Sequence, residues 1–243
     1  MQVRRFVYHR ECKELFAVPT DVQLLRKRAP MAPDSIKFSS SRRTILGAAT
    51  ASLMCSGHGA RAQTVTAMGE VYINGQRATP GAVIRPGDRV LTGPESTLTL
   101  AIGEDAFRLR SLTSVEFGGT PDSTLVSGLR VLTGALLGAF RKSAPRQVQT
   151  ATATIGIRGT AIYVEANPVL TYVCTCYGEV ELECATYRSK KRVVARDHAP
   201  NYIFSRVLSG RSIVEAPVIN HTNQELADIE NLAGRPPVLP VKP

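Results

Sequence analysis

Short apolar runs separated by turn-forming residues restrict the fold of this 243-residue chain more than any other feature. From Val65 to Phe204, runs rich in β-branched and aromatic residues alternate with Gly, Pro, Asn and Asp. These punctuating residues favour turns, because Gly tolerates positive φ and Pro fixes φ. Turn signals spaced about 8–12 residues apart, without a helical pattern between them, predict an all-β protein. We expect a single β-rich sandwich or roll domain over residues 65–204.

Individual turns can be placed from residue pairs. Asn74-Gly75 follows the run Gly69–Ile73 and is the strongest short signal for a two-residue turn. Further turn signals are Pro80-Gly81, Pro86-Gly87-Asp88, Gly93-Pro94 and Gly103-Glu104-Asp105. The strands expected beside them cover residues 83–84, 89–92, 97–102, 106–110, 129–132 and 136–140.

One short helix is expected in the C-terminal segment, residues 205–243. Thr222 and Glu225 have the spacing of a capping box, in which each side chain bonds the other residue's backbone N–H. Apolar residues then recur every three to four positions until Gly234, a residue type that commonly ends helices. The tail from Arg235 to Pro243 contains four prolines and is expected to be extended.

Residues 1–62 have the parts of an export leader. Arg42 and Arg43 precede the apolar stretch Thr44–Met54, and Ala60-Arg61-Ala62 matches an A-x-A cleavage site. The paired arginines resemble a twin-arginine signal, which directs folded proteins to the twin-arginine export machinery. Eleven apolar-stretch residues are too few for a membrane span, which needs about 20. We therefore expect cleavage after Ala62, a periplasmic or secreted location, and no membrane span in the mature chain.

Translation from Met31 would give this leader an n-region of ordinary length, so we expect Met31 to be the true start, with a long n-region as the alternative.

The leader also holds much of the chain's positive charge. Residues 1–62 contain 11 basic and 4 acidic side chains, which leaves 19 and 16 in the remaining 181 residues. A net charge of +10 therefore falls to +3, and no nucleic-acid partner is expected. The basic cluster Arg188–Arg192 is interpreted as a solvated hairpin tip.

With the strands placed, an ordered series of motifs from Gly69 to Leu182 resembles a FecR-type domain, named for a periplasmic regulator of iron-citrate uptake. The most specific part is Thr150–Thr160, which ends in Arg158-Gly159-Thr160. The resemblance also uses Gly69-x-Val71-x-Ile73-Asn74-Gly75, Pro86-Gly87-Asp88-x-Val90-x-Thr92-Gly93, Leu132-x-Gly134-Ala135-Leu136 and Tyr177-Gly178-Glu179-Val180. Within this motif we expect Gly159 to hold a conformation that other residues resist, and Arg158 to form a salt bridge or cap at a sheet edge.

The resemblance implies an exported binding or sensing module of the bacterial cell envelope. FecR-type regulators also have a cytoplasmic segment that meets a sigma factor, a membrane span and a further C-terminal signalling domain. The sequence lacks the patterns for these parts, so the anti-sigma apparatus is not implied. The partner is expected to be an unidentified envelope protein or a small ligand. A purely structural cell-surface module is a weaker alternative.

Three cysteines follow the leader, at Cys174, Cys176 and Cys184. Their arrangement depends on a hairpin turn expected around Gly178. A two-residue turn would place Cys174 and Cys176 on the face opposite Cys184, whereas a three-residue turn would place all three on one face. The second register would allow a Cys174–Cys184 disulfide or a thiolate cluster. The row Glu179, Glu181 and Glu183 is interpreted as the solvated face of the following strand.

These cysteines and two histidines form the candidate site. His198 and His221 follow the leader, and thiolate with imidazole is a ligand set that suits Zn or Cu. The alternatives left open are a disulfide with a spare thiol, a metal centre and a thiol-redox role. No nucleophile elbow, metalloprotease motif or phosphate loop occurs, so an enzyme is not favoured.

Overall fold

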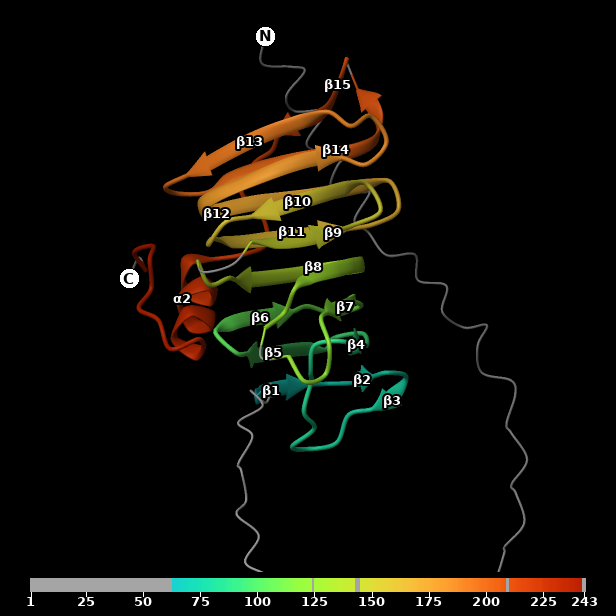
Figure 1. The fold of residues 1–243 in the computed structure, drawn as a ribbon, viewed down its shortest axis with the longest axis vertical. Coiled ribbons are helices and arrows are strands. Elements are labelled where there is room, and N and C mark those ends of the chain that lie inside the picture. Colours follow the sequence, from blue (N-terminus) through green and yellow to red (C-terminus); the bar gives the residue numbers. More distant parts are fainter. Residues whose placement is uncertain (1–62, 124, 143–144, 209, 242–243) are drawn as a thin grey trace, which may run out of the picture. The chain divides into compact units, whose positions relative to one another are not determined.

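The computed structural model describes residues 63–241, except residues 124, 143–144 and 209. The leader, with Met31, Arg42, Arg43 and Ala62, lies outside the described residues. The all-β prediction is confirmed, since the described chain forms strands and one short helix, α2 (Asn223–Leu232), near the C-terminus (Figure 1). The strands are β1 (Gln63–Met68), β2 (Val71–Ile73), β3 (Gln76–Arg77), β4 (Arg89–Thr92), β5 (Thr97–Ile102), β6 (Asp105–Leu109), β7 (Ser114–Gly118), β8 (Gly128–Ala139), β9 (Arg146–Gln149), β10 (Ala153–Ile157), β11 (Ala161–Ala166), β12 (Leu170–Cys184), β13 (Lys190–Ala195), β14 (Ala199–Leu208) and β15 (Arg211–Glu215).

The strands form two halves that share the long strands β8 and β12. The first half has the order β1-β5-β6-β8-β11-β12-β14-β15. The second half has the order β3-β2-β4-β7-β8-β9-β10-β12-β13. All of these pairs are antiparallel except β8 with β9. The start of β12 therefore belongs to one half and its end to the other.

The main core fills the space between the two halves. Leu98 and Phe107 enter it from the first half, and Val90 and Phe117 from the second. The rings of Phe107 and Phe117 meet edge to face, with centroids 5.3 Å apart. Alternation along the strands puts one face of each half into this core, as expected for a sandwich. The outer face of the first half is also buried where α2 covers it with Leu226, Ala227 and Ile229.

Glycines with positive φ mark the points where β8 and β12 cross between the halves. Gly134 has φ +88° and Gly178 has φ +87°. Residues 170–177 of β12 pair with β11 or β14, whereas residues 178–184 pair with β10 and β13. The hairpin expected around Gly178 is therefore wrong. Gly178 instead bends one continuous strand. The prediction failed because a glycine flanked by alternating apolar residues is compatible both with a hairpin turn and with a strand that changes sheets.

Two local predictions are confirmed. Asn74 and Gly75 form the turn between β2 and β3, with φ values of 51° and 82°. Thr222 is the N-cap of α2, the Thr222–Glu225 capping box is complete, and Gly234 follows the helix with φ +71°. Strands continue past the expected boundary at Phe204, since β14 runs to Leu208 and β15 follows. Polar residues in this exposed hairpin hide the alternation.

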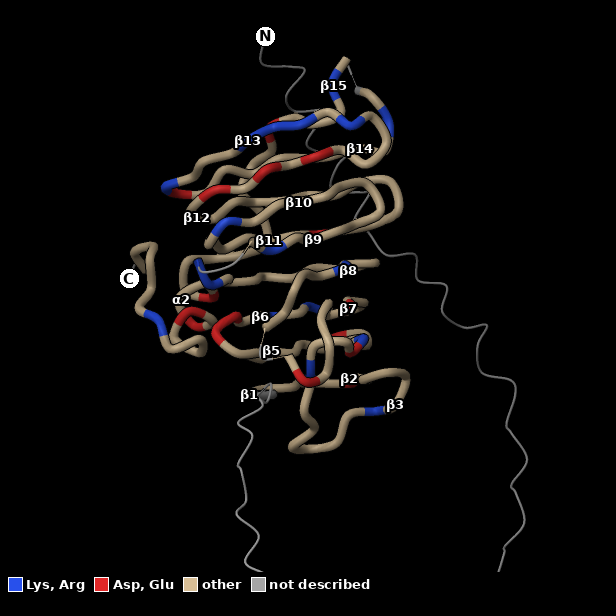
Figure 2. Tube along the Cα trace, viewed as in Figure 1, with Lys and Arg blue, Asp and Glu red and all other residues tan. Residues whose placement is uncertain are grey.

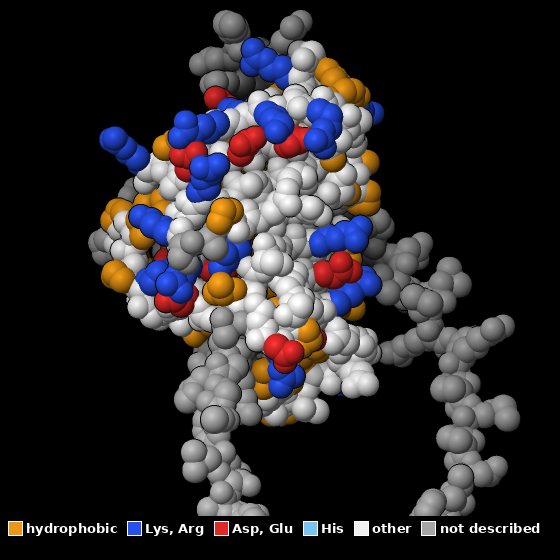
Figure 3. Space-filling model, in the orientation of Figure 1, with side chains coloured by type: hydrophobic (Ala, Val, Ile, Leu, Met, Phe, Trp, Pro, Cys, Tyr) orange, Lys and Arg blue, Asp and Glu red, His pale blue; other side chains and the backbone are white. Residues whose placement is uncertain are grey.

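The basic cluster and the glutamate row lie opposite each other. In the register of β12 with β13, Glu181 faces Arg192 and Glu183 faces Lys190. Lys190 pairs with both Glu181 and Glu183, and Arg192 pairs with Glu179 at 2.7 Å. Basic and acidic residues therefore follow neighbouring strands and interleave on the surface (Figures 2 and 3). A basic surface paired in this way offers little net charge to a polyanion. In the described part of the chain, no helix is long and apolar enough to cross a membrane.

Candidate metal centre

Cys174 and Cys176 lie two residues apart on β12, so their side chains leave the strand on the same face. Val173, between Tyr172 and Cys174, points into the main core, which places both cysteines on the outer face. Both thiols are fully buried there and neither forms a disulfide. Two sulfur ligands are thus fixed on a rigid element of the first half of the sandwich.

His198 and His221 come from two other segments. His198 lies in the turn between β13 and β14, and its backbone φ of 41° is in the left-handed region, which is uncommon for this residue type. His221 directly precedes Thr222, the N-cap of α2, and follows Asn220, whose φ is 58°. Both turns aim their imidazole rings at the cysteine pair, since Cys174, Cys176, His198 and His221 place one ligand atom each within 4.8 Å of the others.

Two separations between the ligand atoms are close to those of a tetrahedral metal site. Zinc with thiolates at about 2.3 Å and imidazole nitrogens at about 2.0–2.1 Å would have S–N edges of about 3.5 Å and N–N edges of about 3.3 Å. The distance from Cys174 Sγ to His198 Nδ1 is 3.5 Å. The distance from His221 Nε2 to His198 Nδ1 is 3.1 Å. These two edges are close to those around a bound zinc ion, and all four ligand atoms lie within 4.8 Å of one another.

Hydrogen bonds on the outer nitrogens select the tautomer of each histidine. His221 Nδ1 lies 2.7 Å from the carbonyl oxygen of Ile219, which can only accept, so Nδ1 carries the proton. His198 Nε2 lies 2.7 Å from Asn223 Oδ1. The Asn223 amide is oriented because its Nδ2 donates to the carbonyl of Pro240 at 2.8 Å. In the neutral rings, the lone pairs of His198 Nδ1 and His221 Nε2 then face each other and need a shared cation or proton.

The electrostatics of the cluster favour a cation in the same place. Hydrogen bonds with Cys176, and also with His198 and His221, together lower the pKa of Cys174 to about 4, although burial acts in the opposite direction. The same contact with Cys174, together with burial, raises the pKa of Cys176 well above its usual range. The Cys174 sulfur also raises the pKa of His198 against the opposing effect of burial. Negative charge thus collects on Cys174, and thiolate is the form of cysteine that binds metals.

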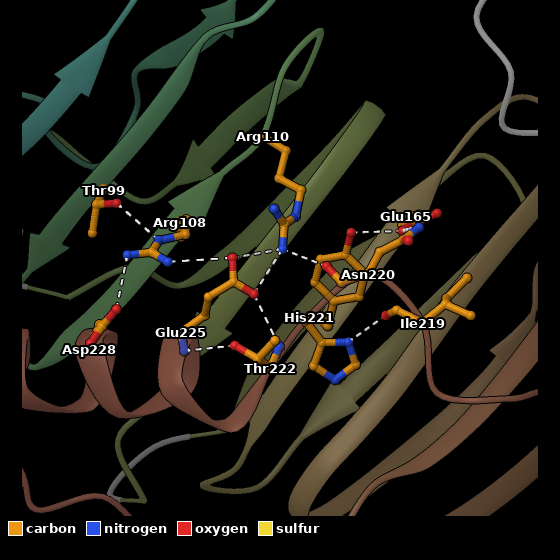
Figure 4. A network of polar contacts seen from close by, with 11 residues as sticks. Thr99, Arg108, Arg110, Glu165, Ile219, Asn220, His221, Thr222, Glu225 and Asp228 are labelled. Carbon is orange, nitrogen blue, oxygen red and sulfur yellow. Dashed lines mark hydrogen bonds and ion pairs between the residues drawn. The ribbon is translucent and has the colours of Figure 1, made fainter. Parts of the chain in front are cut away.

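A polar network lies around His221 and the start of α2 (Figure 4). The His221 ring stacks on Tyr163, with centroids 4.6 Å apart, and the Arg110 guanidinium lies over the Tyr163 ring. Arg110 Nη2 donates to Glu225 Oε1 and Oε2 at 2.9 and 3.0 Å, and to the Asn220 carbonyl at 2.5 Å. Arg110, directly after β6, therefore contacts both the residue before His221 and the first turn of α2.

The remaining sequence-predicted residues lie elsewhere. Cys184 is in the main core, and its Sγ is 3.5 Å from the Phe204 carbonyl. Cys174 is on the outer face of the first half, whereas Cys184 is in the main core beyond the Gly178 bend of β12, and both thiols are free. The suggested Cys174–Cys184 disulfide is therefore not formed in this structure. Arg158 is exposed and lines a shallow hollow with Glu179 and Arg192. Gly159 has φ +63°, and a Cβ there would lie 2.6 Å from the Lys142 Cα. It therefore holds a conformation that residues with a side chain resist, as predicted. Thr160 is buried beside it.

Sequence reasoning missed the residues around the ligands. Asn223 was not among the predicted site residues, although it orients His198. Tyr163 and Arg110 were also missed, and they are 58 and 111 residues away from His221 along the chain. No local pattern marks such residues, because their role depends on sheet pairing and on where α2 docks.

Comparisons with known proteins add a likeness of fold. No family model and no curated protein matches the chain. Two crystal structures of a candidate anti-sigma factor from Parabacteroides distasonis are similar to it, each with 14% identity and a TM-score of 0.44. The matches cover 59% and 60% of this chain and 73% and 74% of the other. Likeness at this level says nothing about shared function.

Proposed function

We propose that this chain is an exported, FecR-like binding or sensing module of the bacterial cell envelope that holds Zn²⁺ in a closed centre formed by Cys174, Cys176, His198 and His221. The observation that carries the metal assignment is the geometry of the four ligand atoms. One S–N separation of 3.5 Å and the N–N separation of 3.1 Å fit a tetrahedron, all four ligand atoms lie within 4.8 Å of one another, and the outer nitrogen of each histidine has an acceptor.

Zinc suits this set better than copper. Two thiolates and two imidazoles in a tetrahedral arrangement are a characteristic zinc set, whereas Cu(II) prefers tetragonal geometry or a trigonal set with one cysteine. Four protein ligands leave no position for water or substrate, which is typical of structural rather than catalytic zinc. The role that follows is mechanical: the ion joins β12, the turn after β13 and the segment before α2. A thiol-redox protein is the alternative, in which Cys174 and Cys176 would exchange electrons rather than bind metal.

Export is supported by the leader residues and fits the metal centre. A twin-arginine signal suits a protein that folds, and can take up its metal, before it crosses the membrane. Zinc binding by a buried Cys₂His₂ set requires the folded sandwich, because the four ligands come from three separate segments. The FecR-like assignment rests on the ordered motifs that end in Arg158-Gly159-Thr160. The partner or ligand would be a component of the envelope, bound without the anti-sigma apparatus.

The test is elemental analysis of the full-length chain expressed with its own leader and recovered from the periplasm. One zinc per chain is expected for the wild type, with less than a tenth of that in Cys176→Ser and in His221→Gln. Cys184→Ser is the matched control, since it also removes a buried thiol but should keep its zinc. Replacing Arg42 and Arg43 with lysine should leave the precursor in the cytoplasm.

Other outcomes would identify which part fails. A metal-free wild type with Cys174 and Cys176 oxidised would replace the zinc assignment with the redox alternative. Stoichiometric copper would keep the centre and change the ion. Periplasmic recovery of the lysine variant in wild-type amount would remove the twin-arginine route without touching the metal assignment.

A further inference from the structure

The proline-rich tail returns along the helix to the metal centre. After α2 ends at Leu232, Arg235 is fixed by Glu230 and by the backbone carbonyl of Glu104. The chain then runs back beside α2 (Figure 1) until the Pro240 carbonyl meets Asn223 at the start of the helix. A ten-residue helix is about 15 Å long, a distance that six extended residues cover readily. The tail is thus attached at both ends of α2.

Asn223 uses both ends of its amide in this arrangement. Its Nδ2 donates to Pro240 O at 2.8 Å, and its Oδ1 lies 2.7 Å from His198 Nε2. An amide turned by half a rotation would present a donor to His198 Nε2–H and an oxygen to the Pro240 carbonyl. Both contacts would then be lost, so the Pro240 carbonyl determines which end of Asn223 faces the ligand. One buried anchor holds the tail in place: Leu239 is 6% exposed, whereas its neighbour Val238 is 57% exposed.

We propose that the C-terminal tail, Arg235–Val241, is a strap that controls the release of the metal by orienting Asn223 against the ligand His198. This proposal rests on the proposed zinc centre and assigns Asn223 as a positioning residue. The chemical reason is that an acceptor on the outer nitrogen fixes the ring and raises the basicity of the metal-binding nitrogen. His198 is also the most accessible ligand, with 12% of its side chain exposed, so its departure opens the site to a chelator.

Three variants of the full chain separate this role from a general structural one. Asn223→Ala removes both hydrogen bonds. Asn223→Asp keeps an acceptor for His198 Nε2–H, needs no orientation by the tail, and places an acceptor against the Pro240 carbonyl, which displaces the strap. Leu239→Ala loosens the strap and leaves Asn223 intact, and Val238→Ala is its matched control on the exposed side. An acidic residue is favourable in the first turn of a helix, so Asn223→Asp should fold.

The measurement is the rate at which the zinc-loaded protein transfers Zn²⁺ to a chromophoric chelator, together with the absorption spectrum of the Co²⁺-substituted form. We expect roughly 10- to 100-fold faster release in Asn223→Ala and Leu239→Ala, the range typical of lost outer-shell contacts. Val238→Ala and Asn223→Asp should release zinc at close to the wild-type rate, and Leu239→Ala should have no further effect in the Asn223→Asp background. The Co²⁺ spectrum should change in Asn223→Ala alone among the Asn223 variants.

A wild-type rate in Asn223→Ala, or an equal acceleration in Asn223→Asp, would overturn the positioning role. An acceleration by Leu239→Ala that persists in the Asn223→Asp background would overturn the route from tail to Asn223. These failures differ from failure of the zinc centre, in which the wild type itself would contain no zinc.

Discussion

Two neighbouring acidic residues form ion pairs in opposite surroundings, and this contrast gives a test at the scale of single residues. Asp105 pairs with Arg146 at 3.2 Å, with their side chains 1% and 2% exposed. Burial raises the pKa of Asp105 above its usual value, although Arg141 N–H and Arg146 act against this. Asp105→Asn takes the carboxylate away from a buried guanidinium, and removal of one partner from such a pair destabilises proteins by about 3–5 kcal/mol. Urea unfolding of the zinc-saturated protein should show a loss in this range.

Glu104→Gln is the control for this prediction. Glu104 pairs with Arg141, but their side chains are 52% and 46% exposed, and exposed pairs contribute about 1 kcal/mol or less. An equal loss in both variants would mean that burial does not determine the strength of these pairs. A loss below 1 kcal/mol in Asp105→Asn would mean that water reaches the Arg146 guanidinium once the carboxylate is gone.

The residues of the metal centre could be predicted only in part from the sequence. The sequence limits the ligands to three cysteines and two histidines, and the spacing of two between Cys174 and Cys176 places them on one face. It cannot exclude Cys184, because that depends on whether Gly178 starts a hairpin or bends a strand. His198 and His221 are brought together by two turns, and nothing in the local sequence of either turn identifies the other.

At the scale of elements, β12 depends on the bend at Gly178. A Cβ at this position would lie 2.8 Å from the Thr160 Cβ and 3.0 Å from the Gly159 carbonyl, and φ is +87°. Left-handed backbone costs about 1–2 kcal/mol for a residue with a side chain, and the clash with backbone adds to it. We expect Gly178→Ala to lower the free energy of unfolding by more than about 2 kcal/mol and to weaken zinc retention, because Cys176 is two residues away.

Gly156→Ala is the matched control, on β10 beside β12. Its added Cβ would meet nothing nearer than the Glu181 carbonyl at 3.7 Å, and its φ is not positive. Alanine in such a strand position should be neutral or stabilising by about 0.5–1 kcal/mol. Equal destabilisation in both variants, measured by urea unfolding, would show that the bend has no special requirement for glycine.

Elements whose signals are local could be predicted, and those set by sheet pairing could not. The Thr222–Glu225 capping box and the Asn74-Gly75 turn determine their structures within four residues. Gly178 is different, because a positive-φ glycine between two alternating segments is compatible with a hairpin or with a strand shared by two sheets. The choice depends on β10, β11, β13 and β14, which pair with β12 on either side of the bend.

At the scale of the whole β domain, the metal centre links the strand β12 to the segment that begins α2. Helix α2 has ten residues, too few to be stable alone in water. It is held by its buried apolar side chains, by the pairing of Arg110 with Glu225, and by His221 at its start. A ligand at 1,000 times its Kd stabilises the folded state by about 4 kcal/mol, and for a protein of this size that is roughly 8–16 °C in Tm. Chelation should therefore lower Tm by about this amount.

The loss of stability on chelation should also differ between parts of the domain, because the free energy of local unfolding depends on the contacts that each element makes. Hydrogen exchange of the chelated protein should show reduced protection over Asn223–Leu232, while β10 (Ala153–Ile157), paired on both sides and part of the main core, keeps its protection. Equal loss in both segments would mean that the metal supports the sandwich as a whole. Unchanged protection of α2 would mean that the apolar contacts and Arg110 hold the helix without the metal. A loss of protection in α2 alone would identify the metal centre as the link between the sheet and the C-terminal segment. The position of that segment would then depend on the supply of metal.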